Sequence, residues 1–299
     1  MPTFDYIPPH ESTGVAIEQG YSTIWENNLF YNTWLQPERT FTSRFMVDGV
    51  GTIMVRKPAD ATETIPGKPG RKFNHKNAAD SFVPINLCNN YQESDIIYGA
   101  ALASVQNDSK VKTMHLENVI NKINGGVNLS ALAALADQST AINGAALTAS
   151  NVKAQILAAR RQAVENKAGS VDVVLCSPAT YETIMLAAGD KFDLNFNNQI
   201  ASEGRVGRWL GLDFYEVNGF AAPTAQYFKD FESSATSVAL SGIDFIMYDH
   251  NSFAVVHNLM DIGITEGRPI LTGVFAQGEA NFGYKVTNDK RAYVRKTAT

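Results

Sequence analysis

The sequence predicts a mixed α+β protein whose helices and strands do not follow one repeating order. Three observations predict this class. Runs of β-branched and aromatic residues indicate strands before residue 91 and after residue 240. Apolar residues recur at helical spacing over 93–124 and 148–166. No internal repeat or low-complexity tract is present, so solenoid and fibrous classes are excluded.

The composition is that of a globular chain with few charges. Of the 299 residues, 44% are hydrophobic and 18% are charged, and the formal net charge is −5. A broad nucleic-acid-binding face needs a surplus of Lys and Arg, which this chain lacks. A low charge content with many small polar residues suits a surface buried between subunits, a pattern that many soluble enzymes share.

The N-terminal segment does not resemble a secretion signal. The first 30 residues contain four acids and no Lys or Arg, so the basic region of a signal peptide is missing. No apolar run approaches the roughly 20 residues needed to cross a bilayer. Cys88 and Cys176 are expected to be free thiols in a reducing compartment. We therefore expect a chain made in the cytoplasm, with no membrane partner.

Residues 1–40 combine prolines with large apolar side chains. The prolines prevent a long helix, but a short amphipathic helix over 21–35 fits the apolar spacing. The aromatic side chains need cover, either from their own domain or from a neighbouring subunit, and both alternatives stay open here. In the second case Trp25, Phe30 and Trp34 are candidate subunit contacts.

Residues 41–91 are predicted to form a long two-stranded excursion. The stretches 41–47, 51–55 and 82–87 are β-prone, and two Pro-Gly dipeptides mark turns between them. A lone hairpin is marginal in water, so this one is expected to rest on a partner. Segment 56–76 carries six bases and two acids, and subunit contact is favoured over nucleic-acid contact because aromatics are scarce there. The candidate contacts are Arg56, Lys57, Lys68, Arg71, Lys72 and Lys76.

The middle of the chain is predicted to be mainly helical. A helix over 93–124 is expected to end at Gly125-Gly126, and a short helix is expected within 128–146. Thr148 or Ser150 can cap a helix that runs to about residue 166. After a buried strand over 171–176, Ser177-Pro178 opens another helix that runs to about residue 188.

The last third is predicted to be mostly strands. A single strand over 209–217 is entered through a glycine, and two strands are expected to pair around the turn at 249–251. Long strands close the chain. The predicted strands are 209–217, 245–248, 253–257, 262–265, 270–280 and 282–295.

The sequence contains no recognisable catalytic, metal or phosphate-binding pattern. Zinc-ligand spacing, phosphate-binding glycine loops and a serine-nucleophile elbow are all missing. His250 and His257 flank the predicted turn with Asp249, where a metal or acid–base role competes with an ordinary surface or strand histidine. We therefore expect a protein without enzymatic activity and without a cofactor.

Three stretches, in this order, resemble the Hong Kong 97-type major capsid protein family. VDVVLCSPATYETIML at 171–186 has its strand, Ser-Pro and helix unit. GRVGRWLGLDFYEVNG at 204–219 has its glycine-punctuated turn. FGYKVTNDKRAYVRK, which ends stretch 273–296, is similar to its closing strand with an aromatic-Gly pair.

The resemblance implies four parts and a structural role. The parts are an N-terminal arm at 1–40, an extended E-loop at 41–91, a peripheral domain at 92–125 and 258–299 with the helix as its spine, and an axial domain at 126–257. The implied function is a capsid subunit that self-assembles as pentamers and hexamers into an icosahedral shell around a double-stranded DNA phage genome. Scaffold, portal and decoration proteins are further implied partners, and DNA contact is expected to be weak and non-specific.

Two other functions remain open at this point. An encapsulin-like nanocompartment shell protein would share the fold and enclose a cargo enzyme. An unrelated α+β enzyme would need a concave site with convergent polar groups and would fold residues 1–90 onto its own core.

Overall fold

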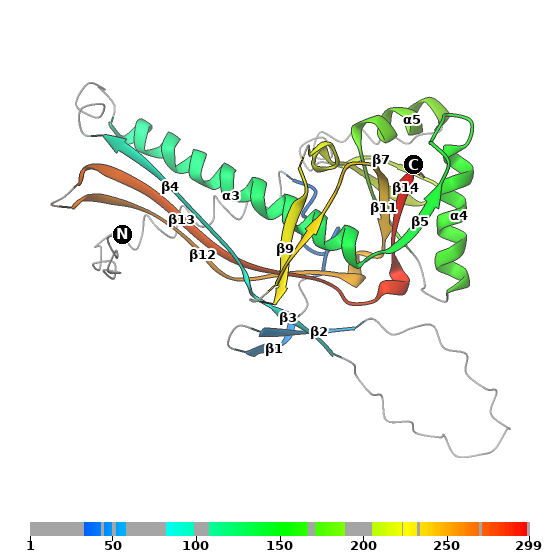
Figure 1. The fold of residues 1–299 in the computed structure, drawn as a ribbon, viewed down its shortest axis with the longest axis horizontal. Coiled ribbons are helices and arrows are strands. Elements are labelled where there is room, and N and C mark those ends of the chain that lie inside the picture. Colours follow the sequence, from blue (N-terminus) through cyan, green and yellow to red (C-terminus); the bar gives the residue numbers. More distant parts are fainter. Residues whose placement is uncertain are drawn as a thin grey trace, which may run out of the picture.

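The computed structural model describes residues 33–42, 45–49, 52–57, 82–98, 108–166, 171–188, 205–222, 224–231, 234–268 and 271–297. These residues form a compact lobe around a six-stranded sheet and an extended lobe around a long three-stranded sheet. One long helix, α3 (Asp108–Gln138), lies along the extended lobe and reaches the compact one (Figure 1). No helix in the described ranges is both long and apolar enough to span a membrane.

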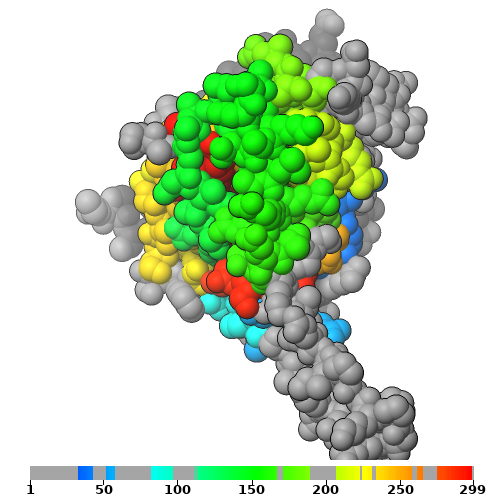
Figure 2. Space-filling model, turned by 90° about the vertical axis from the view of Figure 1, so that its right-hand side faces the viewer, coloured from blue at the N-terminus to red at the C-terminus, as the bar shows by residue number. Residues whose placement is uncertain are grey.

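The compact lobe is a mixed sheet with strand order β5-β14-β11-β6-β8-β7. Helices α4 and α5 pack on it and form the outer face seen in Figure 2. The predicted helix that ends near residue 166, the helix at 177–188 and the strand at 171–176 are confirmed, but the first helix begins at Val152 after Asn151 and not at a cap by Thr148 or Ser150. The elements are β5 (Thr140–Gly144), α4 (Val152–Glu165), β6 (Val173–Cys176), α5 (Pro178–Ala188), β7 (Arg205–Trp209), β8 (Leu212–Glu216), β11 (Ile243–Tyr248) and β14 (Ala292–Thr297).

Local chemistry explains two of these elements. Ser177 caps α5, because its Oγ accepts a hydrogen bond from the Thr180 amide at 3.2 Å. Leu210 and Gly211 both have positive φ, 55° and 79°, as a tight two-residue hairpin turn requires. The predicted single strand at 209–217 is therefore wrong, and the segment forms the turn and second strand of the β7–β8 hairpin.

The extended lobe is an antiparallel sheet with order β12-β13-β4, and α3 lies on one of its faces. Glycines allow the close packing. A Cβ on Gly278 of β13 would lie 3.1 Å from Val119 and 3.0 Å from Ile123 of α3. A separate hairpin, β9–β10, also packs against α3. The elements are β4 (Asn89–Tyr98), β9 (Gln226–Phe231), β10 (Ser234–Val238), β12 (Phe253–Arg268) and β13 (Leu271–Val286).

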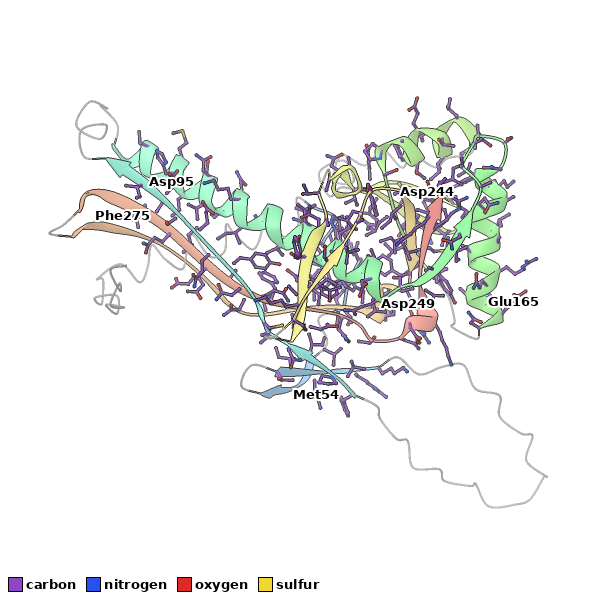
Figure 3. The ribbon with its side chains drawn as sticks, in the orientation of Figure 1. Met54, Asp95, Glu165, Asp244, Asp249 and Phe275 are labelled. Carbon is purple, nitrogen blue, oxygen red and sulfur yellow. The ribbon has the colours of Figure 1, made fainter. Side chains whose placement is uncertain are left out.

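The predicted helix at 93–124 is wrong at both ends. Residues 93–98 belong to strand β4, which pairs with β13, and α3 begins at Asp108. The helix continues through Gly125-Gly126 and includes the expected short helix. Gly126 has a packing reason, because a Cβ there would lie 3.3 Å from the Tyr91 ring. At the far end of β4, Asp95 points toward α3 and bonds His115 (Figure 3).

Two strand predictions near the C-terminus also fail. Strands β11 and β12 do not pair with each other, because a short 3-10 helix, η3 (His250–Ser252), carries the chain from one lobe to the other. The predicted strand 282–295 is broken by η4 (Asp289–Arg291), which carries the chain back.

Three elements run across predicted domain boundaries: β4 spans 91/92, α3 spans 125/126 and β12 spans 257/258. Strand β14 lies inside the six-stranded sheet rather than with β12 and β13, so the range 258–299 does not form one structural unit. The buried Arg295 holds β14 there by donating to Asp244 and to the Ala145 carbonyl. The division into arm, E-loop, peripheral and axial parts stays a prediction.

A third, small sheet lies below the junction of the two lobes in Figure 1. Its strands are β1 (Phe45–Gly49), β2 (Thr52–Arg56) and β3 (Phe82–Asn86), in the order β1-β2-β3. Strands β2 and β3 are the described ends of the predicted excursion and pair antiparallel, as expected from the sequence. We call this sheet the E-loop root.

Candidate assembly surfaces

Residues 33–42, the foot of the predicted arm, pack into their own chain. Trp34 is 5% exposed and stacks on Phe253 with ring centroids 6.4 Å apart. The Thr42 amide donates to the Phe253 carbonyl at 2.8 Å. Trp34 as a subunit contact is therefore a wrong prediction, because its ring is already covered by its own core. Trp25 and Phe30 lie outside the described residues.

The E-loop root is seated on the extended lobe by a small apolar cluster. Ile53, Val55 and Ile85 are buried against Ala254 and Val256 of β12. These contacts hold β2 and β3, the two strands that flank the excursion, against β12. Arg56, at the end of β2, is exposed and Lys57 partly exposed, whereas Lys68, Arg71, Lys72 and Lys76 lie outside the described residues.

A glycine brings two backbones together at this seat. A Cβ on Gly283 of β13 would lie only 2.6 Å from the Asn86 carbonyl oxygen and 2.8 Å from Ile85 Cγ2. Real Cβ atoms do not approach backbone so closely, so only glycine fits this position without movement of the root. Gly283 is part of the aromatic-Gly pair noted in the sequence.

Two asparagines complete the seat. Asn86 Nδ2 donates to the Asp230 carbonyl at 2.9 Å. The Asn89 side chain makes two hydrogen bonds with the backbone of Lys229 in β9. Its Nδ2 donates to the Lys229 carbonyl at 2.9 Å, and its Oδ1 accepts from the Lys229 amide at 2.8 Å. Each bond of this type contributes about 1 kcal/mol net. Hairpin β9–β10 thereby braces the E-loop root, a role that sequence reasoning missed because the partners lie some 140 residues apart.

The long sheet presents a polar face on the side opposite α3. Asp261, Glu279 and Gln92 are direct cross-strand neighbours, so their side chains share one face. Gly278, one residue along, faces α3, so Glu279 faces away from it. Asn90 and Gln92 both donate to Glu279, at 2.8 and 3.1 Å. We call Asp261 and Glu279 the acidic pair of this face.

Large apolar side chains are also exposed on the compact lobe. Val164 on α4 is 62% exposed and Leu186 on α5 is 71% exposed. Both belong to the helices that make the outer face in Figure 2. Single exposed apolar residues are common on soluble proteins and do not by themselves define an interface.

The residues Asp172, Asp249 and His250 form a cluster of potential metal ligands where the two lobes meet. His250 Nδ1 donates to Asp172 Oδ2 at 2.5 Å, and the His250 amide donates to Asp172 Oδ1 at 3.0 Å. Asp249 accepts from Arg291 at 2.6 Å and from the Asn251 amide at 3.0 Å. These oxygens are already engaged, so the contacts favour an ion-pair network over a metal centre.

The charges around His250 alter its protonation. The hydrogen bond to Asp172 raises the pKa of His250 above its ordinary value, partial burial opposes this, and the nearby Asp249 and Glu38 charges add to the rise. Asp249 is labelled in Figure 3, where it lies beside the chain crossings between the lobes. The turn at 249–251 was noted in the sequence, but its partner Asp172 was not.

Comparison with known proteins identifies the class of fold. A scan of protein-family models and a search of curated proteins found no match. Solved structures match over most of the chain. The capsid of cyanophage P-SCSP1u has a TM-score of 0.60 and 16% identity, with 88% of each chain covered.

Two further structures extend this result. The mature capsid of bacteriophage PhiM1 has a TM-score of 0.55 and 11% identity, covering all of this chain and 91% of the other. A virus-like particle from Pyrococcus furiosus has a TM-score of 0.54 and 10% identity, covering 93% and 97%. The chain thus has the fold of shell-forming proteins. The matched chains include phage capsids, so the α+β fold of the Hong Kong 97 type predicted from the sequence is confirmed at the level of the overall fold.

Proposed function

We propose that this chain is the structural capsid subunit of a tailed phage, assembling with its own copies into an icosahedral shell of pentamers and hexamers around double-stranded DNA. The observation that carries the proposal is the likeness to phage capsid structures over nearly the whole chain. In this role the chain is a structural component of the virion, not an enzyme. It would be made in the host cytoplasm, with scaffold, portal and decoration proteins as further partners.

The shape of the described residues supports this proposal. The long sheet extends away from the compact lobe, and the E-loop root lies outside both lobes (Figure 1). A chain that works alone gains little from a long sheet whose face opposite α3 is left largely exposed, because exposed area adds no burial of apolar surface. Identical subunits in slightly different environments can use such extended parts as contacts.

Charge complementarity supports a specific contact between copies. Arg56 and Lys57 begin a segment whose formal charge over 56–76 is about +4, in a chain of net charge −5. The acidic pair Asp261 and Glu279 offers the opposite charge on an exposed face. We propose that the basic E-loop of one subunit lies over the acidic pair of its neighbour, which sets the register between them.

Self-assembly is the direct test. The purified full-length chain, alone and with its scaffold if one is found, is examined by light scattering and negative-stain electron microscopy. Closed particles, hexamers or pentamers are expected. A clean monomer under all conditions, including high protein concentration, contradicts the proposal.

An encapsulin-like shell is the second candidate, because the virus-like particle of Pyrococcus furiosus is similar at a TM-score of 0.54. The contents of native particles distinguish the two. Phage capsids purified from infected cells would contain double-stranded DNA, whereas a nanocompartment would contain a cargo protein. Nuclease treatment after opening the particles, followed by mass spectrometry of the protein contents, separates these outcomes.

A further inference from the structure

The chain passes between the two lobes at two neighbouring strand-to-strand crossings. Residues 249–252 lead from β11 to β12, and residues 287–291 lead from β13 back to β14. Backbone hydrogen bonds join the crossings at both ends. The Asp249 amide donates to the Arg291 carbonyl at 3.0 Å, and the Thr287 amide donates to the Ser252 carbonyl at 2.7 Å. We call this region the lobe junction.

Two ion pairs of different exposure lie at the junction. The Asp249–Arg291 ion pair is largely buried, with side chains 7% and 13% exposed. Arginine keeps its charge at all accessible pH values, so this pair is permanent. The His250–Asp172 pair is more open, at 23% and 38%. It ties η3 to the residue just before β6, and its charge depends on pH.

The foot of the arm belongs to the same junction. Thr42 bonds Phe253 and forms a bridge with Ala254 at the start of β12, next to η3. Glu38 lies close enough for its charge to act on His250. One histidine therefore faces acids from three parts of the chain: Glu38 of the foot, Asp172 of the compact lobe and Asp249 of its own crossing.

We propose that His250 is a protonation-dependent latch that holds the two lobes and the foot of the arm in one relative orientation. Protonated His250 attracts Asp172, Asp249 and Glu38 together and closes the junction. Neutral His250 loses that attraction to the three carboxylates, while the Asp249–Arg291 pair remains, so the junction loosens. The latch is a property of the isolated chain. Its use in adjusting subunit shape within a shell rests on the proposed function.

The sign of the pH effect follows from the direction of the shift. The pKa of His250 is raised in the folded chain, mainly by the bond to Asp172. The stabilisation is therefore complete below the unfolded-state pKa of about 6.5 and is lost as pH rises through the higher folded value. The junction is expected to be closed in mildly acidic solution and looser in alkaline solution.

Hydrogen exchange of the full-length subunit at pH 6 and pH 8.5, corrected for intrinsic rates, tests the latch. The amides of Asp249 and Thr287, which bond across the two crossings, are expected to lose up to about fivefold in protection at the higher pH, because a partly exposed ion pair contributes at most about 1 kcal/mol. H250Q is expected to show low protection at both pH values. If wild-type protection at these amides does not change with pH, or H250Q keeps the wild-type change, the latch is disproved.

A matched control exists in the extended lobe. His115 Nδ1 lies 2.6 Å from Asp95 and is similarly part-exposed, at 24%, but this pair joins α3 to β4 far from the junction. H115Q is expected to leave the pH response of the junction amides unchanged. If H250Q does not fold, D172N removes the main partner charge and must abolish the response instead.

A further experiment with added divalent cations distinguishes the latch from a metal centre. Exchange is repeated at pH 8.5 with Zn²⁺ or Mg²⁺ added, and no change in junction protection is expected. Restoration of protection by either metal in wild type but not in H250Q would assign the cluster to a cation and overturn the proposal. The outcome does not depend on particle formation, so failure of the latch and failure of the capsid proposal can be distinguished.

Discussion

The compact and extended lobes are stabilised in different ways. The compact lobe encloses its own apolar core, in which Ile184, Phe214 and Phe245 are fully buried between sheet and helices. The compact sheet is therefore covered on both faces, by α4 and α5 on one side and by a core shared with α3 on the other. In the extended lobe, α3 covers one sheet face, and the opposite face is covered in part by the E-loop root and carries the acidic pair. The extended sheet leaves much of one face exposed.

The largest expected effect comes from creating a cavity in the core between the compact sheet and helices α4 and α5. Phe214 of β8 is 0% exposed, so Phe214→Ala leaves a cavity and should lower the free energy of unfolding by about 3–5 kcal/mol. Chemical denaturation of the subunit measures this loss. A loss below 1 kcal/mol would contradict the view that the compact lobe is a closed core.

A smaller, positional effect is expected at the E-loop root. Gly283→Ala should displace β3 and cost about 1–3 kcal/mol, because the new Cβ meets the Asn86 carbonyl. The yield of assembled particles should also fall, because the E-loop root holds the two strands that flank the excursion. Gly263→Ala in β12 is the matched control, because a Cβ there meets nothing within 4 Å. Equal yields of particles from both variants would contradict the positional role.

Charge reversal addresses the contact between copies. R56E/K57E should weaken assembly and leave the thermal stability of the subunit within about 0.5 kcal/mol, because exposed pairs are worth at most about 1 kcal/mol each. Combining it with D261K/E279K should restore part of the particle yield. Weaker assembly of wild type at high salt is a second expected sign. A quadruple variant no better than R56E/K57E would argue against this pairing.

The smallest effect on the subunit is expected on the outer face of the compact lobe. Leu186→Ser changes a side chain that is 71% exposed, so the free energy of unfolding should move by no more than about 0.5 kcal/mol. Particle yield measured beside stability tells whether this face is also a contact. A loss above 2 kcal/mol would show that Leu186 packs within its own subunit.

The sequence was most informative where a signal is local. Ser177-Pro178 predicts the start of α5 because capping is decided within three residues, and the observed bond to Thr180 confirms it. The strand over 171–176 is predicted from its run of apolar residues. The structure confirms it, because all four residues of β6 are buried. Both elements lie in the compact lobe.

The failures fall where distant pairing decides. Apolar residues Ile96 and Ile97 fit a helix by spacing, yet ten residues of β4 pair with β13, almost 200 positions away. The expected stop at Gly125-Gly126 fails because helix propensity is a weak prior and Gly126 gains a close contact with Tyr91. Helix and strand propensities depend on local sequence, so they contain no information about a distant segment that pairs with the element in the folded chain.

The candidate sites follow the same division. The basic residues Arg56 and Lys57 were found from charge alone, whereas the acidic pair was missed because Asp261 and Glu279 become neighbours only through sheet register. Trp34 was misjudged because its cover, Phe253, comes from the other end of the chain. Gly283 was noticed as part of a motif, but its purpose required the position of Asn86.

The length of α3 turns small rotations into large displacements. Its 31 residues make a rod about 46 Å long, so a rotation of 1° at the junction moves its far end by about 0.8 Å. A turn of about 10° therefore shifts the tip of the long sheet by about 8 Å while the hydrogen bonds along the rod stay intact. In the proposed shell, such a rotation would place identical chains in fivefold and sixfold surroundings without refolding either end of α3.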